Sequence, residues 1–316
     1  MEEPRVSTSA GTSRAVRVEG FGGLDGLNVR EVPAPHAGSG QIRVRVTAAG
    51  LNPMDWLIVS DESLAAAFGV RPPAGFGFDF AGVVDEVGDG VAGLAGGDRV
   101  FGGVMSRAVA DYVVIDPSRE EVLPTPDGVD DVIAGVLPVA GRTASAALAA
   151  IGVRAGDTVL IGGAAGGVGT IAVQLARLAG ARVLGTASEG SFDFLRSLGA
   201  EPVRYGDGLA ERVRAAAPGG ITAATDLFGT EAAYAALRLG VDPGRVSTIA
   251  ARDPRLGAKA VGGFDAEPGA LQHLAGLIAQ GRLTVPIAAR FPIERIREAV
   301  TLQATRHVRG KVVIVL

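Results

Sequence analysis

A glycine-rich stretch in the middle of the chain is the part of the sequence best suited to chemistry. It reads Asp157-Thr-Val-Leu-Ile-Gly-Gly-Ala-Ala-Gly-Gly-Val-Gly169 and continues as Thr-Ile-Ala-Val-Gln-Leu-Ala-Arg. An apolar strand thus leads into a turn of small residues, and the turn opens an amphipathic helix. Small residues let the backbone approach a pyrophosphate, whose charge then lies at the helix N-terminus. The spacing, Ala164-x-Gly166-x-x-Gly169, has alanine in place of the first fingerprint glycine, but its context predicts a dinucleotide-binding site.

The end of the next predicted strand, Arg182–Thr186, indicates which dinucleotide is bound. An NAD site usually carries Asp or Glu there for the ribose hydroxyls. Here the strand continues as Ala187-Ser188, with no acid at its tip, and the Ser188 hydroxyl could bond a 2′-phosphate. This pattern favours NADPH over NADH. Glu189 could repel that phosphate or face solvent, and Ser188 could instead cap the following helix.

Two kinds of element must position these residues. Up to about Pro126, short β-branched segments bounded by Gly, Pro and Asp predict a barrel-like domain of strands. After it, strand-like segments alternate with helical ones, which predicts βαβ units and a parallel sheet. The first of these helical segments, Val132–Ala150, is rich in alanine, and we expect Pro138 and Gly141 to interrupt it.

The composition excludes several classes of site. A length of 316 residues suggests two domains, and 47% hydrophobic with 20% charged residues is ordinary for a globular protein. The net charge of −4 argues against nucleic acid as a partner. The absence of cysteine excludes disulfides, thiolate nucleophiles and cysteine-ligated zinc, and the three histidines are far apart in the sequence. We see no secretory signal and no membrane span, so we expect a cytoplasmic protein.

Further motifs along the chain carry a resemblance to a known family. They are Ala49-Gly-Leu-Asn-Pro-Met-Asp-Trp56, Gly77-Phe-Asp-Phe-Ala-Gly-Val-Val-Asp-Glu-Val-Gly88, Gly97-Asp-Arg-Val100, Leu137-Pro-Val-Ala-Gly-Arg-Thr143 and Arg309-Gly-Lys-Val-Val313. With the glycine-rich turn, they resemble the medium-chain dehydrogenase/reductase superfamily, in particular its zinc-free quinone oxidoreductase branch. The resemblance covers nearly the whole chain from Arg14.

The resemblance implies an α/β protein with a GroES-like β-barrel catalytic domain and a Rossmann domain built on a doubly wound parallel sheet. We expect a disordered tail over residues 1–13, the catalytic domain over 14–130, the cofactor domain over 131–262 and a C-terminal segment over 263–316 that returns to the catalytic domain. The active site would lie in the cleft between the domains, and a homodimer is usual. Zinc-dependent relatives carry Gly-His-Glu where this chain has Gly77-Phe78-Asp79, so the resemblance implies catalysis without metal.

The resemblance also assigns binding roles. Asn52 would lie near the nicotinamide and its ribose, and Thr143 would contact the nicotinamide side. The residues that cradle the pyrophosphate would be Gly166, Gly167 and Val168, with Gly169 completing the turn. Ser188 and Tyr205 would surround the 2′-phosphate of the adenosine, although Tyr205 could equally be structural.

Two familiar proton donors are missing. Many relatives have a lysine where this chain has Leu57, and related polyketide enoyl reductases often have a tyrosine at the position of Pro53. Three residues stay open as catalytic candidates. Asn52 could donate a side-chain N–H or only form a turn, Asp55 could act on the substrate or fix the backbone, and Arg142 could anchor a carbonyl or form a salt bridge.

Three functions remain open. The first is an NADPH-dependent reductase of quinones or α,β-unsaturated carbonyls, acceptors that need little activation. The second is a tailoring or trans-acting enoyl reductase of a biosynthetic, polyketide-like pathway. The third is an NADPH-binding protein with little catalysis. Nearby aromatic residues could line an apolar pocket for a flat acceptor or belong to the core: Trp56, Phe68, Phe76 and Phe78.

Overall fold

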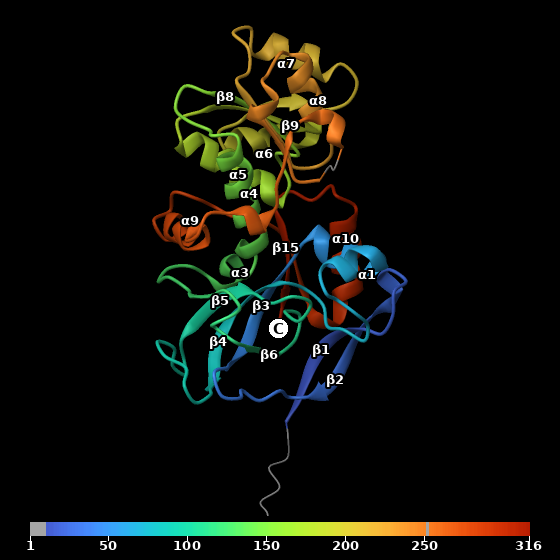
Figure 1. Cartoon of the computed structure of the whole chain (residues 1–316), viewed down its shortest axis with the longest axis vertical. Helices are drawn as coiled ribbons and strands as arrows, with labels where there is room; N and C mark the ends of the chain where they lie inside the picture. The colour runs from blue at the N-terminus through green and yellow to red at the C-terminus, as the bar shows by residue number, and fades with distance from the viewer. Residues whose placement is uncertain (1–10, 251–252) are drawn as a thin grey trace, which may run out of the picture.

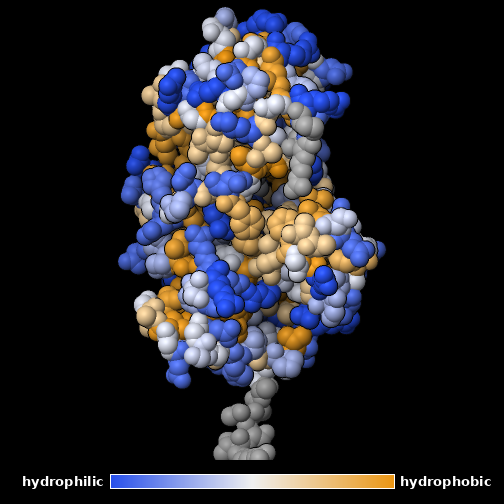
Figure 2. All heavy atoms as spheres, in the orientation of Figure 1, coloured by the Kyte–Doolittle hydropathy of each residue, from blue (hydrophilic) through white to orange (hydrophobic). Residues whose placement is uncertain are grey.

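A computed structural model describes residues 11–250 and 253–316. Most of the predicted tail, residues 1–10, and residues 251 and 252 lie outside the described residues. The described chain forms two halves stacked along the long axis, with the first strands in one half and the middle of the chain in the other (Figure 1). In Figure 2 apolar side chains gather at the waist between the two halves.

The first half is built on antiparallel strands. A ribbon of β1 (Thr12–Val18) and β2 (Leu27–Pro33) stands beside a seven-stranded sheet in the order β14-β15-β3-β4-β5-β7, with β6 paired to β3. The strands of this sheet are β3 (Ile42–Leu51), β4 (Asp79–Val87), β5 (Arg99–Gly103), β6 (Tyr112–Ile115), β7 (Val122–Pro124), β14 (Ile287–Pro292) and β15 (Lys311–Val315). The alternating residues Ile42, Val44 and Val46 are buried, as a strand with one face on a core requires.

The second half is a parallel sheet in the order β10-β9-β8-β11-β12-β13. Its strands are β8 (Thr158–Gly162), β9 (Arg182–Ala187), β10 (Glu201–Arg204), β11 (Ala223–Asp226), β12 (Val246–Thr248) and β13 (Lys259–Ala260). Numbered from β8, this order is 3-2-1-4-5-6, the doubly wound arrangement, and it reverses direction between β8 and β11. The helices that cover the sheet include α5 (Gly167–Leu178), α6 (Phe192–Ser197), α7 (Leu209–Ala216) and α8 (Glu231–Arg238). The predicted fold class is confirmed.

The helix predicted over Val132–Ala150 forms two helices, α3 (Asp131–Ala134) and α4 (Leu137–Ala150). The interruption lies between them and not at Pro138 or Gly141, so that prediction was wrong in its position. Pro138 falls in the first turn of α4, where its missing N–H costs nothing. Gly141 lies inside α4, where a Cβ would come within 2.9 Å of Leu274 Cδ1.

The C-terminal part of the chain crosses between the halves. The helix α9 (Ala270–Ala279) packs on α4, whereas β14 and β15 extend the sheet of the first half through antiparallel pairing of β15 with β3. Three more helices flank the first half: α1 (Pro53–Ser60), α2 (Glu62–Ala67) and α10 (Ile296–Ala304). No helix in the described part of the chain is both long enough and apolar enough to cross a membrane.

Candidate functional site

The glycine-rich turn joins β8 to α5 at the point where the strand order reverses. Gly163 has a φ of +69°, which a residue with a Cβ rarely adopts, and Gly166 is the extended residue before α5. A Cβ on Gly169 would lie 2.2 Å from the Gly163 carbonyl oxygen. The turn therefore needs glycine for its own geometry. The N–H groups of residues 167–169 are in the first helical turn, where no intrahelical carbonyl reaches them, so the cradle fits a pyrophosphate.

Side chains that could read the adenosine end gather where β9 and β10 end. Ser188 is exposed and makes no capping bond with its hydroxyl, so the capping role weighed from the sequence is wrong. Arg204 pairs in register with Ala187, the residue before Ser188, and its guanidinium lies 3.6 Å from the Glu189 carboxylate. Tyr205 follows and is 44% exposed.

Arg204 is a residue that sequence reasoning missed. It ends a strand of only four residues, and the register that brings it beside Ser188 exists only once β9 and β10 pair. The sequence shows an arginine at position 204, but it does not show which residues of the neighbouring strand lie beside it. The exposed guanidinium of Arg204 and hydroxyl of Ser188 suit a 2′-phosphate better than the ribose hydroxyls of NAD. The negative charge of Glu189 opposes the binding of that phosphate.

On the other side of the turn, Asn52 is part of a buried polar cluster. Its Nδ2 donates to Asp79 Oδ2 at 2.9 Å, and its Oδ1 accepts from Lys311 Nζ. Lys311 Nζ also donates to the Leu51 carbonyl at 3.1 Å and lies 3.5 Å from Asp79 Oδ2. The Val139 N–H donates to Asp79 Oδ1 at 2.9 Å. Three parts of the chain, the end of β3, the start of β4 and the start of β15, thus fix the Asn52 amide.

The ionisable groups of this cluster have shifted pKa values. Burial, and then the charge of Asp79, raises the pKa of Asp55 to about 7. Burial also raises the pKa of Asp79, against the opposing effect of Lys311, and it lowers the pKa of Lys311. Asp55 accepts from the Asn52 backbone N–H at 2.7 Å in a capping box at the start of α1. Asp55 therefore fixes the local backbone, the structural role weighed for it.

Lys311 connects this cluster to the turn. A Cβ on Gly167 would lie 2.7 Å from Lys311 Cδ, and the Gly310 N–H donates to the Ala165 carbonyl at 3.0 Å. The stem of Lys311 therefore packs against the backbone that would hold a pyrophosphate. The sequence showed Lys311 and Asp79 only inside motifs 232 residues apart, so neither could be recognised as a neighbour of Asn52.

Arg142 and Thr143 lie on α4 beside an aromatic pair. Thr143 is buried, and a Cβ on Gly263 would lie 3.1 Å from its hydroxyl oxygen. The guanidinium of Arg142 pairs with Glu121 at 2.6 Å, which is the salt-bridge alternative weighed from the sequence. It also lies 5.7 Å from the ring centre of Phe78 and 5.9 Å from that of Phe264.

Phe264 belongs to a short 3₁₀ turn, η5 (Gly263–Asp265), and is 69% exposed. Its ring meets the buried Phe78 edge to face at 6.3 Å between ring centres. Of the other aromatic residues considered for a pocket, Phe76 is in the core of the first half and Phe68 packs against a small cluster beside α2. Trp56 donates through its indole N–H to Gln303 on α10 at 2.5 Å.

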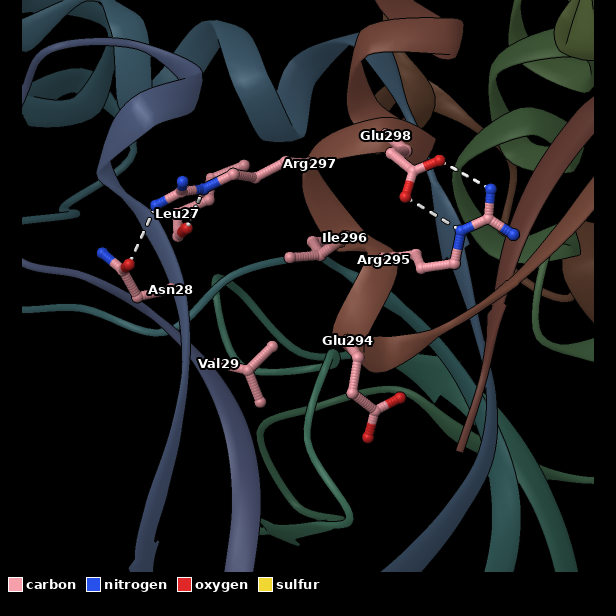
Figure 3. A pocket seen from close by; sticks show the side chains of 8 residues that line it. All are labelled: Leu27, Asn28, Val29, Glu294, Arg295, Ile296, Arg297 and Glu298. Atoms are coloured by element: carbon pink, nitrogen blue, oxygen red, sulfur yellow. Dashed lines mark hydrogen bonds and ion pairs between the residues drawn. The ribbon is translucent and has the colours of Figure 1, made fainter.

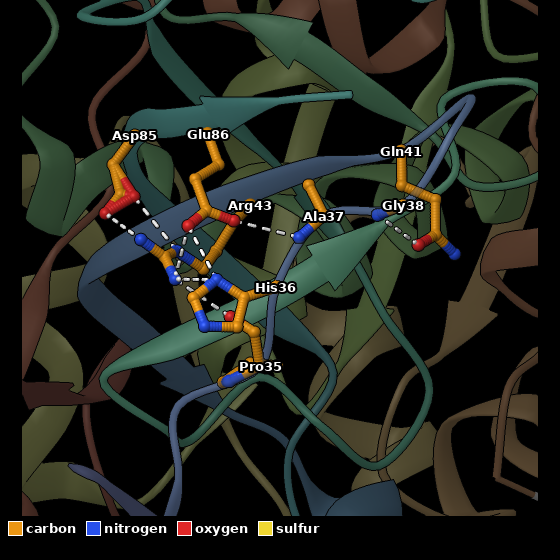
Figure 4. A network of polar contacts seen from close by, with 8 residues as sticks. All are labelled: Pro35, His36, Ala37, Gly38, Gln41, Arg43, Asp85 and Glu86. Atoms are coloured by element: carbon orange, nitrogen blue, oxygen red, sulfur yellow. Dashed lines mark hydrogen bonds and ion pairs between the residues drawn. The ribbon is translucent and has the colours of Figure 1, made fainter. Parts of the chain in front are cut away.

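Two other polar regions lie apart from the turn. A hollow of about 480 Å³ between β2 and the start of α10 is lined by side chains that bond one another, such as Arg295 with Glu298 and Arg297 with Asn28 (Figure 3). On the first half, Arg43 pairs with Asp85 at 2.9 Å and His36 with Glu86 at 2.8 Å (Figure 4). Both are self-satisfied surface networks, and His36 is a solvated residue.

Comparison with known proteins agrees with this architecture. Residues 38–127 match the family model of the alcohol dehydrogenase GroES-like domain, and residues 198–314 match that of the zinc-binding dehydrogenase. The chain is 34% identical over 320 residues to a spectinabilin polyketide synthase system protein, NorB, of Streptomyces orinoci. That match covers 94% of this chain but spans only 14% of the length of NorB.

Two solved structures are similar over almost their whole length. The quinone oxidoreductase from Coxiella burnetii is 29% identical with a TM-score of 0.86, and the match covers 97% of this chain and 100% of that one. The CurK enoyl reductase is 25% identical with a TM-score of 0.84, with coverage of 96% and 99%.

Proposed function

The chain belongs to the medium-chain dehydrogenase/reductase superfamily, and from this premise we propose that it is a zinc-independent reductase that transfers a hydride from NADPH to a quinone or an α,β-unsaturated carbonyl. One observation carries the proposal: the pyrophosphate cradle at Gly166–Gly169 touches Lys311, which in turn holds the Asn52 amide. The cofactor turn and the buried polar cluster therefore form one continuous site. When bound there, a nicotinamide supplies the hydride.

The donor set does not fit the zinc that the second family model implies. At the position of the histidine ligand stands Phe78, whose ring has no atom that can ligate a metal, and the chain has no cysteine. In the described ranges, no group of three His, Cys, Asp or Glu residues could hold a metal ion. The proposed reaction therefore does not use zinc.

The residues of the chain would bind and orient the dinucleotide and exclude water from the reacting groups. Ser188, Arg204 and Tyr205 are suited to the 2′-phosphate. Asn52 has a second N–H and a second lone pair beyond its bonds to Asp79 and Lys311. It can therefore offer one donor to the nicotinamide side in a fixed orientation.

The aromatic pair offers an apolar surface to a conjugated acceptor. Phe78 and Phe264 both lie near the guanidinium of Arg142, the residue before Thr143, and Glu121 neutralises the charge of that guanidinium. A neutral, flat molecule suits such a surface better than a carboxylate does. Because Leu57 and Pro53 replace two familiar donors, we propose that water supplies the proton that follows the hydride.

The similarity to the NorB polyketide synthase protein and to the CurK enoyl reductase favours a second candidate. In this reading the acceptor is an enoyl thioester on a carrier, as in a trans-acting enoyl reductase. Both candidates share the cofactor site and differ only in the acceptor.

The experiment is the oxidation of NADPH, beside NADH, by purified protein with quinones, enals, enones and a crotonyl pantetheine thioester. Turnover with NADPH and a quinone or enone supports the first candidate, and turnover with the thioester alone supports the second. If NADPH binds but no acceptor is reduced, the protein is a cofactor-binding protein with little catalysis, and both candidates are wrong.

We further propose a homodimer in the cytoplasm that acts on a small electrophilic acceptor without nucleic acid or membrane. The net charge of −4 supports the absence of a nucleic-acid partner. Light scattering on the purified protein tests the dimer: a mass near 32 kDa instead of twice that value would contradict it.

A further inference from the structure

We infer that Phe264 is a specificity-determining residue of the acceptor site, and that its exposed ring selects acceptors with a fused aromatic ring system. The inference rests on the proposed function, because it takes Thr143 as the nicotinamide side of the cofactor site. It deepens that function by naming the side chain, on the short turn η5, that would distinguish a fused-ring quinone from an aliphatic enone.

The backbone that carries Phe264 is fixed against α4. The Gly262 N–H donates to Asp265 Oδ2 at 2.7 Å, and the Asp265 N–H donates to the Gly262 carbonyl at 3.1 Å, so the turn is closed on itself. At Gly263 the backbone lies directly on α4, because a Cβ there would come within 3.1 Å of the Thr143 hydroxyl oxygen. Phe264 is therefore held one position away from a residue that contacts Thr143.

Two groups orient the ring of Phe264. It meets Phe78 with 6.3 Å between ring centres and an angle of 87° between ring planes, the edge-to-face geometry that aromatic pairs prefer. Arg142 Cζ lies 5.9 Å from the ring centre of Phe264 and 5.7 Å from that of Phe78. The three groups form a triangle with nearly equal sides, so two contacts at once set the orientation of the ring.

Most of this ring stays free for a ligand. Phe264 is 69% exposed, the largest fraction among the exposed large apolar side chains in the described part of the chain, whereas Phe78 is buried. Phe78 packs over Gly103, where a Cβ would lie 1.9 Å from Phe78 Cε1. The inner ring is therefore a support and the outer ring a contact surface. The apolar area that a flat molecule buries on such a surface grows with the number of its fused rings.

The ring lies where the two halves of the molecule meet. Phe264 follows β13 of the parallel sheet, and Phe78 precedes β4 of the antiparallel sheet. The residue after Phe78 is Asp79, which accepts from Asn52 Nδ2 at 2.9 Å. The aromatic pair thus connects the contact with Thr143 to the cluster around Asn52, the two side chains proposed for the nicotinamide. An acceptor beside that nicotinamide would meet Phe264.

The charges beside the ring favour a neutral acceptor. Arg142 pairs with Glu121 at 2.6 Å, and its Nε donates to the Pro138 carbonyl at 3.3 Å. The guanidinium therefore holds the two rings while its own charge is already neutralised. A carboxylate on the acceptor would have to compete with Glu121, whereas a neutral quinone can stack on Phe264 and leave this ion pair intact.

The test is the KM for naphthoquinone, benzoquinone and butenone, each measured at saturating NADPH. In Phe264→Ala we expect the KM for naphthoquinone to rise about 10-fold with kcat unchanged, the effect of one lost aromatic contact. The KM for butenone should change by less than twofold, and benzoquinone should be intermediate, because smaller acceptors bury less area on the ring. Phe264→Trp should restore the wild-type KM, and Phe264→Leu, which keeps apolar bulk without a ring, should fall between.

Binding measurements separate this role from folding and from cofactor binding. Phe264→Ala should leave the dissociation constant of NADPH, measured by nicotinamide fluorescence, unchanged. Calorimetric titration of the NADP-saturated protein with naphthoquinone measures acceptor binding without turnover, and it should also weaken about 10-fold in Phe264→Ala. The matched control is Leu178→Ala, which removes an exposed apolar side chain from the end of α5 opposite the glycine turn and should change neither constant. Urea unfolding shows that each variant is folded.

The outcomes distinguish this inference from the proposed function. If the wild type reduces quinones but Phe264→Ala changes the ratio of the naphthoquinone and butenone KM values by less than twofold, the inference is wrong and the proposed function stands. Equal weakening of NADPH would also overturn it, because the ring would then contact the cofactor. If no acceptor is ever reduced but Phe264→Ala weakens naphthoquinone in the calorimeter, the inferred contact stands and the proposed function is wrong. Turnover with the pantetheine thioester alone would overturn the inference.

Discussion

At the scale of single residues, the unusual feature is the set of ionisable side chains buried around Asn52. Asp55, Asp79 and Lys311 are each at most 5% exposed. Such groups are costly to bury unless they are paired and hydrogen-bonded, and here one cation faces two carboxyl groups. The cluster can therefore bury both carboxyl groups at low cost only if one of them stays protonated up to near neutral pH.

Stability should consequently fall as the pH rises. The pKa of Asp55 is raised from its ordinary value of 3.8 to about 7 in the folded protein, so between these values the folded state binds more protons than the unfolded state. We expect the free energy of unfolding to decrease from pH 5 to pH 8, and Asp55→Asn to reduce this slope. Urea titrations at four pH values check it. If the free energy of unfolding depends on pH equally in the wild type and in Asp55→Asn, Asp55 is not the source of that dependence.

Arg204 allows a second prediction at this scale. Arg204→Gln should weaken NADPH by about tenfold, the effect of one charge-assisted hydrogen bond, and leave NADH unchanged. Glu189→Gln should act in the opposite direction, because it removes the carboxylate 3.6 Å from that guanidinium. Fluorescence titration with both dinucleotides measures the ratio. Equal weakening of NADH by Arg204→Gln would show that the residue is structural.

At the scale of elements, the turn between β8 and α5 depends on the absence of side chains. The first turn of α5 is pressed against the start of the loop, with Gly169 facing the Gly163 carbonyl and the Ala164 backbone. Neither neighbour is the end of a flexible side chain, so neither can move aside cheaply. The shape of the cradle is therefore fixed by the backbone.

Gly169→Ala should displace this turn and abolish measurable dinucleotide binding, because its Cβ would lie 2.2 Å from a carbonyl oxygen. The matched control is Gly276→Ala in α9, where a Cβ meets nothing within 4 Å. That change should leave binding intact and stabilise the protein by about 0.5–1 kcal/mol, the usual gain from replacing a helical glycine. NADPH titration and urea unfolding test both. Normal binding by Gly169→Ala would refute the steric argument.

At the scale of the whole molecule, the two halves meet where the C-terminal strand passes the phosphate turn. Lys311 begins β15 in the sheet of the first half, yet its stem packs on Gly167 in the second. The preceding residue, Gly310, bonds Ala165. Occupation of the turn and the orientation of Asn52 are thus linked through one short segment.

Lys311→Met should destabilise the protein by about 3–5 kcal/mol, because it leaves Asp79 as an unpaired charge in the core. The double variant Lys311→Met/Asp79→Asn should recover much of this loss, since it removes both charges. The midpoint and slope of urea unfolding report the free energy. Equal destabilisation of the single and double variants would mean that packing of the Lys311 stem, rather than its charge, matters.

The order of the elements and the chemistry of the phosphate turn could be predicted from the amino-acid sequence. Strand, glycines and helix are contiguous there, so local backbone sterics and the helix terminus carry the information. The sequence also shows directly that Phe78 stands at the position of a histidine ligand and that cysteine is absent, so the lack of a zinc site could be predicted without the fold. The fold class followed from alternating strands and helices, whose periodicity is also a property of neighbouring residues.

Which distant side chains come into contact could be seen only in the folded protein. Asn52 follows β3, Asp79 begins β4 and Lys311 begins β15, and only the pairing of β15 with β3 and of β3 with β4 brings them together. The register of β10 on β9 pairs Arg204 with Ala187, the residue before Ser188, and Arg306 stacks on Phe228 across the two halves. Strand register and packing between domains depend on the whole chain's core, so no spacing along the sequence could indicate these contacts.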